Sequence, residues 1–292
     1  MQLDRPRIRR AFSNAAAGYE QTAVLQAQVG DLLLERLELL KTAPQRVLDV
    51  GAGTGRLTAR LRKRFPKAQV IALDLALGML RQAKHNAGWW RPFVRVAGDA
   101  QALPLADASI DVLMSNLCLQ WCGDLKAALY EFRRVLKPGG WLLFSSFGPD
   151  TLKELRSAWR AADQGAHVHV FLDMHDVGDA VLAQGFANPM FDVERYTLTY
   201  ADARSVMTEL KAIGAGNAMA QRARGLTGKG AYQRMLEAYE SQRSQGRLPA
   251  SYEVIFGQAQ APLAGQPLRG PQGDLASFSL AAMRAQLQKR GS

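Results

Sequence analysis

The sequence lacks the features that would place it in a membrane or in a disulfide-bonded class of protein. It has only two cysteines, Cys118 and Cys122, among 292 residues, so no disulfide framework is indicated and a reducing compartment is expected. No apolar run is long enough to span a bilayer, and the arginines near the N-terminus do not lead into the apolar run of a signal peptide. We therefore expect a cytoplasmic protein with no membrane association.

Signatures of metal binding, RNA recognition and repeat architecture are also missing. The two cysteines have no second pair of ligands, and His167 and His169 have no third ligand close by in the sequence, so no metal site is predicted. No internal repeat is visible, and no RNA-reading motif accompanies the basic charge. Nucleic acid is therefore not expected as a partner.

The sequence does contain an excess of positive charge and enough apolar residues for a large core. Lys and Arg number 37 against 26 Asp and Glu, which gives a net charge of +11, and 48% of the residues are hydrophobic. Length alone allows one large domain or two. The positive charge favours acidic partners, which include nucleic acid, a membrane surface or an acidic protein.

The most informative stretch runs from Val47 to Arg56. Val47 to Val50 is a short apolar run that predicts a buried strand, and the residues from Leu57 onward have helical spacing. Between them, every second residue from position 51 to 55 is glycine. A strand, a glycine turn and a helix in this order are the usual place for a nucleotide-like ligand in a doubly wound α/β sheet.

The residues around this turn indicate which ligand it holds. A dinucleotide fingerprint has the spacing G-x-G-x-x-G, whereas here Asp49, Gly51, Gly53 and Gly55 alternate. Pyrophosphate would be disfavoured beside Asp49, but a cationic ligand would be favoured. The pattern resembles motif I of class I S-adenosylmethionine-dependent methyltransferases, in which the acid faces the methionine end of the ligand. The alternative is a tight turn that binds nothing.

Polar residues also end the next predicted strands. Asp74 follows the strand at 69–73 and lies about 20 residues past the glycine turn, where an acid can accept hydrogen bonds from ribose hydroxyls; its alternative role is to cap the helix at 76–87. Asp99 is placed to receive the adenine amino group, and Asn116 ends the strand at 109–116. The predicted donor-binding residues are Asp49, Gly51, Gly53, Gly55, Asp74, Leu75, Asp99, Ala100 and Asn116.

The rest of the chain alternates between predicted helices and strands. Helices are predicted at 124–136, 150–163, 176–185, 201–214 and 231–243, and strands at 93–96, 141–147, 191–200 and 250–257. Residues 137–140 are expected to stop the first of these helices, and Asp150 and Thr151 to cap the second. Trp121 is expected to pack rather than to line a pocket. The alternation predicts an α/β fold with a doubly wound, mostly parallel sheet.

We predict three parts in the chain. Residues 1–45 form either a helical lid over the ligand or an ordinary helix pair, and 46–258 form the methyltransferase domain with a helical insertion at about 201–245. Residues 259–292 are expected to be a disordered tail apart from a helix candidate at 276–289. The basic, glycine-rich stretch 221–230 is expected to be a mobile loop, either solvated or docking an acidic partner.

Several segments between residues 5 and 258 resemble the malonyl-[acyl-carrier-protein] O-methyltransferases of biotin synthesis. They are Phe12-x6-Tyr19-Glu20-Gln21, Asn116-Leu117-x-Leu119-Gln120-Trp121-Cys122, Arg134-Val135-Leu136-Lys137-Pro138-Gly139-Gly140, Thr151-Leu152-x-Glu154-Leu155, Leu210-Lys211-x-Ile213-Gly214-Ala215 and Gly246-Arg247-x-Pro249-x2-Tyr252. The resemblance implies a seven-stranded, Rossmann-like sheet, a monomer, and methyl transfer from S-adenosylmethionine to the free carboxylate of malonyl-acyl carrier protein. The methyl ester would disguise the charged end so that fatty-acid enzymes can elongate the chain toward a pimeloyl group.

For that reaction, the resemblance makes Tyr19 the first candidate for a residue that closes over the methyl donor and touches the substrate. Lys211, Arg204 and His167 are candidates for recognising the substrate carboxylate, and His167 and His169 for lining the acyl entrance; a solvated charge or simple packing is the alternative for each. A carboxylic acid with a pKa of about 4 is already ionised at neutral pH. The enzyme therefore needs alignment rather than a base, and alignment can supply roughly 7–11 kcal/mol.

Other functions stay open at this point. A methyltransferase that acts on a different small molecule or on nucleic acid would carry the same donor site. Residues 147–155 also resemble a mitochondrial assembly factor of respiratory complex I that shares this fold and is associated with arginine hydroxylation. A protein that only binds S-adenosylmethionine is a third alternative.

Overall fold

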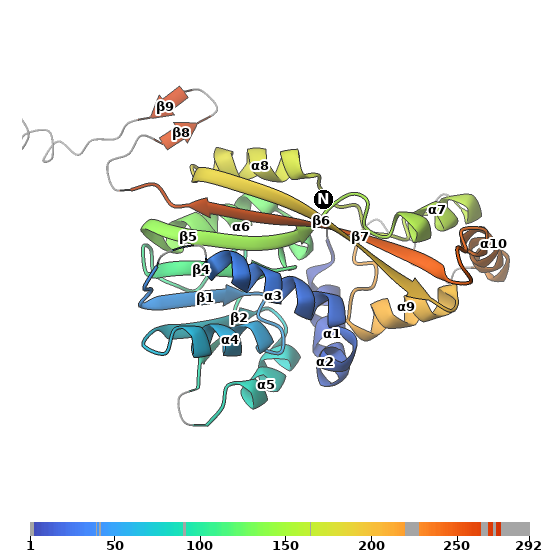
Figure 1. Ribbon diagram of the computed structural model, residues 1–292, viewed down its shortest axis with the longest axis horizontal. Helices are drawn as coiled ribbons and strands as arrows, with labels where there is room; N and C mark the ends of the chain where they lie inside the picture. The colour runs from blue at the N-terminus through green and yellow to red at the C-terminus, as the bar shows by residue number, and fades with distance from the viewer. Residues whose placement is uncertain are drawn as a thin grey trace, which may run out of the picture.

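The computed structural model describes residues 3–38, 40, 42–89, 92–163, 165–219, 228–263, 268–270 and 273–275. Its centre is a seven-stranded sheet with the strand order β3-β2-β1-β4-β5-β7-β6 (Figure 1). The strands are β1 (Arg46–Val50), β2 (Gln69–Asp74), β3 (Val94–Ala97), β4 (Ile110–Asn116), β5 (Leu136–Phe147), β6 (Ala187–Tyr200) and β7 (Leu248–Gln260). Within this sheet only β7 runs antiparallel to its neighbours. The predicted mostly parallel α/β sheet is confirmed.

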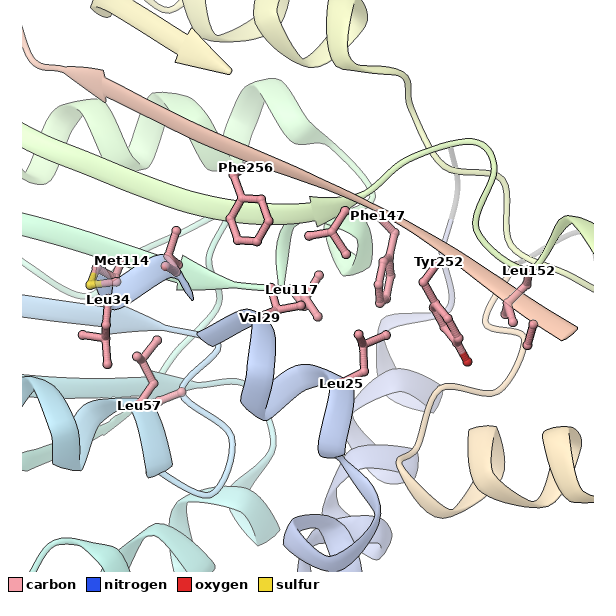
Figure 2. Packing of buried hydrophobic residues seen from close by; sticks show 14 of the residues in the cluster. Leu25, Val29, Leu34, Leu57, Met114, Leu117, Phe147, Leu152, Tyr252 and Phe256 are labelled. Atoms are coloured by element: carbon pink, nitrogen blue, oxygen red, sulfur yellow. The ribbon is translucent and has the colours of Figure 1, made fainter. Parts of the chain in front are cut away.

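Helices cover both faces of the sheet, which makes it doubly wound. Buried side chains of α3 (Val24–Glu38) and α4 (Arg56–Arg64) belong to one core cluster, and those of α6 (Leu125–Val135) and α8 (Met174–Ala183) belong to the other. Figure 2 shows Leu25 and Val29 of α3 facing side chains near the ends of β4, β5 and β7. Because a strand covered on both faces is apolar on both, the central strands show near-continuous apolar runs rather than alternation.

The N-terminal helices lie at the carboxyl edge of the sheet. They are α1 (Arg5–Ala15) and α2 (Tyr19–Thr22), joined by a single 3-10 turn. The ring of Phe12 meets that of Trp121 edge-on, with centroids 5.2 Å apart, and Trp121 follows the end of β4. On its other side α1 approaches α5 (Leu77–Asn86) so closely that a Cβ on Gly78 would overlap the backbone of Ser13. The N-terminal helices therefore pack against the fold, and their role as a lid stays a prediction.

A second group of helices gathers where β6 and β7 extend past the other strands (Figure 1). It consists of α7 (Lys153–Ala162), α9 (Ala203–Ala212) and α10 (Lys229–Glu240), and the last two lie between β6 and β7 in the sequence. The hydroxyl of the fully buried Tyr239 on α10 donates to the carbonyl of Pro249 on β7 at 2.9 Å. The helical elements predicted between residues 201 and 245 are thus attached to the long strands.

Two predicted element boundaries are wrong. The strand predicted from residue 141 begins earlier, at Leu136, because the backbones of Gly139 and Gly140 bond to Ala261 at 2.9 and 2.8 Å; α6 ends before residue 137, as predicted. Neither Asp150 nor Thr151 caps α7, whose N-cap is Leu152 at a φ of 55°. Thr151 is engaged elsewhere, since its hydroxyl donates to the carbonyl of Glu253 on β7 at 3.0 Å.

The prediction of a disordered tail from residue 259 is wrong for the part of it that the structure describes. Strand β7 continues to Gln260, and a separate antiparallel pair follows, β8 (Leu268–Gly270) with β9 (Gly273–Leu275). The backbone at 259 and 260 is needed to complete the ladder with β5. The helix candidate at 276–289 and most of the predicted loop at 221–230 lie outside the described residues. In the described chain, no helix has both the length and the apolar character to cross a bilayer.

Candidate active site

The three glycines after β1 are required for three different physical reasons. All have positive φ, at 74° for Gly51, 55° for Gly53 and 78° for Gly55, a region that favours glycine. A Cβ on Gly51 would lie 2.5 Å from the sulfur of Cys118, whereas a Cβ on Gly53 would meet open space. A Cβ on Gly55 would press on the ring of Phe93 at 2.8 Å. Gly55 thus serves the packing of α4, and Gly53 leaves room at the edge of the sheet.

Asp49 lies beneath this turn and is almost completely buried, with 1% of its surface exposed. Because side chains alternate along a strand, Asp49 shares the face of Val47 and points toward α4, where the hydroxyl of Thr58 donates to its carboxylate at 2.5 Å. Burial raises the pKa of Asp49 to about 7, with the Thr58 bond acting in the opposite direction. Sequence analysis missed Thr58, since nothing in the local pattern marks a hydroxyl one turn into a helix as a partner.

Asp74, at the end of β2, fastens the glycine turn to the next loop. Its carboxylate accepts hydrogen bonds from the backbone N–H of Gly53 at 2.8 Å and of Ala76 at 2.7 Å. Burial raises the pKa of Asp74, and these backbone bonds lower it. The N-cap of α5 is Ala76 without a side-chain cap, so the helix-capping alternative for Asp74 is wrong. A carboxylate can accept about four hydrogen bonds, so Asp74 can accept one more.

The two remaining polar residues of this edge already have protein partners. Asp99 accepts from the backbone N–H of Gln101 at 2.9 Å and forms an ion pair with Arg5 of α1. The side-chain amide of Asn116 donates to the carbonyl of Gln26 on α3 at 2.9 Å and accepts from the hydroxyl of Ser145 at 2.8 Å. Both contacts tie helices to the sheet edge, so an adenine group at Asp99 would share that carboxylate with Arg5.

Two adjoining cavities of about 180 and 100 Å³, here called the rim cavities, open along this edge. The predicted donor-binding residues that line them are Asp49, Gly51, Gly53, Asp74, Leu75, Asp99, Ala100 and Asn116. Gly55 lines neither cavity, in agreement with its packing contacts. The structure therefore brings together every predicted donor-binding residue except Gly55.

A third cavity of about 250 Å³, the apolar cavity, lies beside the rim cavities. Most of its lining was missed by sequence analysis and includes Phe12, Gln26, Leu117, Phe147, Thr151, Leu152, Leu155, Trp159, Phe171, Met207, Leu210 and Tyr252. Figure 2 shows Phe147 and Tyr252 next to each other at the ends of β5 and β7. Such side chains give no separate signal in a sequence, because apolar residues at helical or strand spacing also describe ordinary core. Trp121, expected only to pack, lines this cavity as well as touching Phe12.

Tyr19 is the residue at which the cavities meet. Among the described residues, it alone lines both rim cavities and the apolar cavity. Burial raises the pKa of Tyr19, and the nearby Asp74 and Cys118 raise it further. The hydroxyl therefore stays protonated at neutral pH and can donate a hydrogen bond into the space between the cavities.

The three residues predicted to recognise a carboxylate are placed differently. Lys211 is exposed near the end of α9 and lines the apolar cavity, whereas Arg204, near the start of the same helix, does not line it. His167 lines the cavity, but its ring stacks on Trp159 with centroids 3.7 Å apart, and its Nε2 lies 2.8 Å from a carboxylate oxygen of Asp163. The geometry therefore favours Lys211 over His167, and it does not favour Arg204.

The described part of the chain contains no cluster of three or more His, Cys, Asp or Glu suited to a metal ion. Cys118 and Cys122 are both free thiols. Their mutual hydrogen bond and burial raise the pKa of the Cys118 thiol well above its usual value. Cys118 lines a rim cavity as a neutral thiol packed against Gly51.

Known proteins match both the sequence and the fold. Residues 48–144 match the family model described as a methyltransferase domain. The chain is 50% identical over 266 residues to the malonyl-[acyl-carrier protein] O-methyltransferase of Gallionella capsiferriformans, which covers 89% of this chain and 92% of that protein. It is 49% identical over 276 residues to the protein of the same name from Nitrosospira multiformis, over 89% and 90% of the two chains. Among solved structures, a putative methyltransferase from Bacillus halodurans superposes with a TM-score of 0.57 at 17% identity, covering 79% of this chain and 98% of that one.

Proposed function

The chain belongs to the malonyl-[acyl-carrier protein] O-methyltransferase family, and from this premise we propose that it transfers a methyl group from S-adenosylmethionine to the free carboxylate of malonyl-acyl carrier protein. Its enzyme class is that of S-adenosylmethionine-dependent O-methyltransferases. The product is the malonyl methyl ester, whose uncharged end suits the chain elongation that leads toward biotin.

The observation that carries this proposal is the position of Tyr19. It lies where the rim cavities, which carry the acidic side chains, meet an apolar cavity that is large enough for an acyl group. A methyl donor on one side and an acyl acceptor on the other would meet beside its hydroxyl. This arrangement supports transfer between two bound molecules, rather than binding of the donor alone.

The proposed binding of S-adenosylmethionine depends on negative charge and on a glycine that leaves space beside the backbone. S-adenosylmethionine carries a positive sulfonium and an adenosine, and the rim cavities offer the carboxylates of Asp49, Asp74 and Asp99. We assign Asp74 to the ribose hydroxyls, because its carboxylate lines a rim cavity and can accept a further hydrogen bond. Asp49 contributes negative charge from beneath the turn, and Gly53 leaves space for the ligand.

The chemical step needs alignment rather than proton transfer. The malonyl carboxylate is ionised at neutral pH, so one of its oxygens attacks the methyl carbon while the bond from that carbon to sulfur breaks. The electron pair stays on sulfur, S-adenosylhomocysteine leaves as a neutral thioether, and no proton moves. The apolar lining of the cavity keeps water away from this line of attack, and alignment alone can supply roughly 7–11 kcal/mol.

Two donors at the apolar cavity suit the substrate carboxylate. The protonated hydroxyl of Tyr19 lies at the junction with the rim cavities, and Lys211 adds a positive charge at the wall formed by α9. We assign Tyr19 to the oxygen beside the methyl group and Lys211 to overall charge recognition. The excess of 37 Lys and Arg over 26 Asp and Glu supports docking of an acidic carrier protein.

The decisive experiment uses the full-length protein with methyl-labelled S-adenosylmethionine. Malonyl-acyl carrier protein, acyl carrier protein without a malonyl group, and total RNA are offered in parallel. We expect base-labile label on malonyl-acyl carrier protein alone, together with release of S-adenosylhomocysteine in equal amount. Label on RNA alone would contradict the proposal, and so would donor binding without any release of S-adenosylhomocysteine.

A further inference from the structure

His169 is a buried histidine with one ring nitrogen unused. The side chain lies in the segment between α7 and α8 and is 7% exposed. Its Nε2 lies 3.1 Å from the backbone carbonyl of Gln120, and because a carbonyl can only accept, Nε2 carries the hydrogen. Burial lowers the pKa of His169, so the ring is neutral and Nδ1 is an acceptor. No described residue donates to Nδ1.

Gln120, whose backbone carbonyl contacts His169, has a second unused acceptor. Its side-chain nitrogen donates to the carbonyl of Leu117 at 2.8 Å, which fixes the orientation of the amide. The other end of that amide, Oε1, is buried and has no donor among the described residues. A buried acceptor without a partner costs about 1–3 kcal/mol. Two such atoms on contacting residues leave two acceptors that a hydrogen-bond donor of a bound molecule could satisfy.

Both residues stand in the partition between two cavities. On one side is the apolar cavity, and on the other is an outer cavity of about 670 Å³ lined by the start of α6, part of α8 and residues 169–172. The residues that line both are Gln120, Phe147, His169 and Phe171. Trp121 touches His169 with ring centroids 5.7 Å apart and touches Phe12 of the lid on its other side. A chain that crossed this partition would therefore run toward the lid and Tyr19.

The polarity of the substrate decides which part of it can meet these acceptors. The malonyl carboxylate and the thioester carbonyl only accept hydrogen bonds, so neither can satisfy Nδ1 of His169 or Oε1 of Gln120. The pantetheine arm that holds the acyl group on the carrier contains amide N–H donors. Donors of the protein at Tyr19 and Lys211 suit the acyl end, and acceptors at His169 and Gln120 suit the arm.

We infer that His169 and Gln120 are positioning residues that accept hydrogen bonds from the amide N–H groups of the carrier's pantetheine arm where it passes from the outer cavity into the apolar cavity. This inference rests on the proposed function and extends it to the path of the arm. The arm enters beside residues 169–172 and places the malonyl carboxylate at Tyr19. Selectivity for carrier-bound substrate then arises partly inside the protein, in addition to any contact with the carrier surface.

Two substitutions of His169 distinguish the roles of its two ring nitrogens. His169→Gln places an amide N–H where Nε2 donates to Gln120 and removes the acceptor at Nδ1. His169→Asn keeps an acceptor near the position of Nδ1 and gives up the bond to Gln120. Gln120→Met removes the acceptor Oε1 while keeping a side chain of similar length. Each variant is first shown to bind S-adenosylhomocysteine with the affinity of the unchanged protein, which verifies its folding and its donor site.

The substrates are malonyl-carrier proteins with the natural arm and with an arm whose amide nitrogens are replaced by oxygen, which removes the donors. We expect the unchanged protein to prefer the natural arm by about tenfold in kcat/KM, mainly through KM. His169→Gln and Gln120→Met should each lose most of this preference, and His169→Asn should retain part of it. His167→Gln alters the neighbouring histidine of the same cavity, whose ring is held by Asp163, and should keep the full preference.

The outcomes are distinguishable. If the unchanged protein does not methylate the natural malonyl-carrier protein, the proposed function fails and the inference fails with it. If the protein methylates both arms equally well, the inference alone is overturned. It is also overturned if His169→Gln and Gln120→Met lower the rates for both arms by the same factor, because that result describes a merely structural role.

Discussion

The rim cavities and the apolar cavity lie side by side but are built in different ways. The rim cavities are lined by residues between Asp49 and Asn116, which include three carboxylates, and by residues of the N-terminal helices. The apolar cavity collects residues from Phe12 to Tyr252 and presents mainly aromatic and aliphatic side chains. A polar site depends on a few exact contacts, whereas an apolar wall tolerates substitutions that conserve volume. Single substitutions in the rim cavities, the donor side, should therefore weaken binding strongly. Single substitutions in the apolar cavity, the acceptor side, should have smaller effects that depend on the residue.

The largest effect is expected from Gly53→Val. A Cβ at Gly53 points into open space at the rim, and the residue has a φ of 55°, so valine would occupy ligand space and add roughly 1–3 kcal/mol of backbone strain. Binding of S-adenosylhomocysteine, measured by calorimetry, should become undetectable. Gly88→Val is the matched control, because Gly88 has a φ of 69° and open space around it but lines neither rim cavity. If both variants bind alike, the assignment of Gly53 is wrong.

Asp74→Ala should have the next largest effect on the donor side. It removes the acceptor of the Gly53 and Ala76 N–H groups as well as the proposed ribose contact. We expect donor binding to weaken by about 1–3 kcal/mol. Asp74→Asn keeps one acceptor oxygen and should lose less. An unchanged dissociation constant in both variants would leave Asp74 with only its role of holding the turn.

The pH dependence of the binding affinity should differ between S-adenosylmethionine, which carries a sulfonium, and S-adenosylhomocysteine, which does not. In the free protein Asp49 is mostly protonated below its pKa of about 7 and charged above it. A sulfonium favours the charged carboxylate, so affinity for S-adenosylmethionine should rise with pH through this range, by up to about tenfold per unit below pH 7. S-adenosylhomocysteine has no sulfonium and should show a weaker dependence.

Thr58→Val sharpens this test. The variant removes the hydrogen bond that lowers the pKa of Asp49, while valine keeps the shape of the buried threonine. The pH midpoint for S-adenosylmethionine binding should therefore move upward. If affinities for the two ligands have the same pH dependence in the unchanged protein, Asp49 does not sense the sulfonium.

The smallest effect is expected on the acceptor side, from Lys211→Met. The lysine is exposed and lines the apolar cavity, so its loss should raise KM for malonyl-carrier protein by about fivefold, the size of an exposed ion pair of up to ~1 kcal/mol. The affinity for S-adenosylhomocysteine should not change. Arg204→Met, on the same helix but away from the cavity, should change KM less than twofold. Equal increases in KM in the two variants would mean that the positive charge of α9 as a whole, rather than Lys211 at the cavity, attracts the substrate.

The donor side could be predicted from the sequence because its signals are local. An apolar strand, alternating glycines and an acid at each following strand end are separated by short, countable intervals, and parallel strands bring their carboxyl ends to one edge. Gly55, which lines neither rim cavity, has the same sequence signal as Gly53. Only the positions of Ala83 and Phe93 showed that a Cβ at Gly55 would meet packed side chains rather than cavity space.

The acceptor side could not be predicted in the same way. Phe12, Phe147 and Tyr252 look like ordinary core residues in the sequence, and only their convergence produces a cavity. From the sequence, Arg204 and Lys211 are equally good candidates for recognising the substrate carboxylate, since both are basic residues on one predicted helix. The orientation of α9 against the long strands brings only Lys211 of these two to the apolar cavity. The capping role predicted for Thr151 failed for a similar reason, because its hydroxyl donates to the backbone carbonyl of Glu253 on β7.

By itself the sequence determined the doubly wound sheet and predicted a cationic nucleoside ligand at its carboxyl edge, since strand, turn and charge are short-range properties of the chain. The tertiary structure alone decided that Tyr19 lines three cavities and that His169 and Gln120, which are in contact, each have an unused acceptor. Whether a buried polar atom finds a partner depends on which distant segments pack around it, and no spacing along the chain records that.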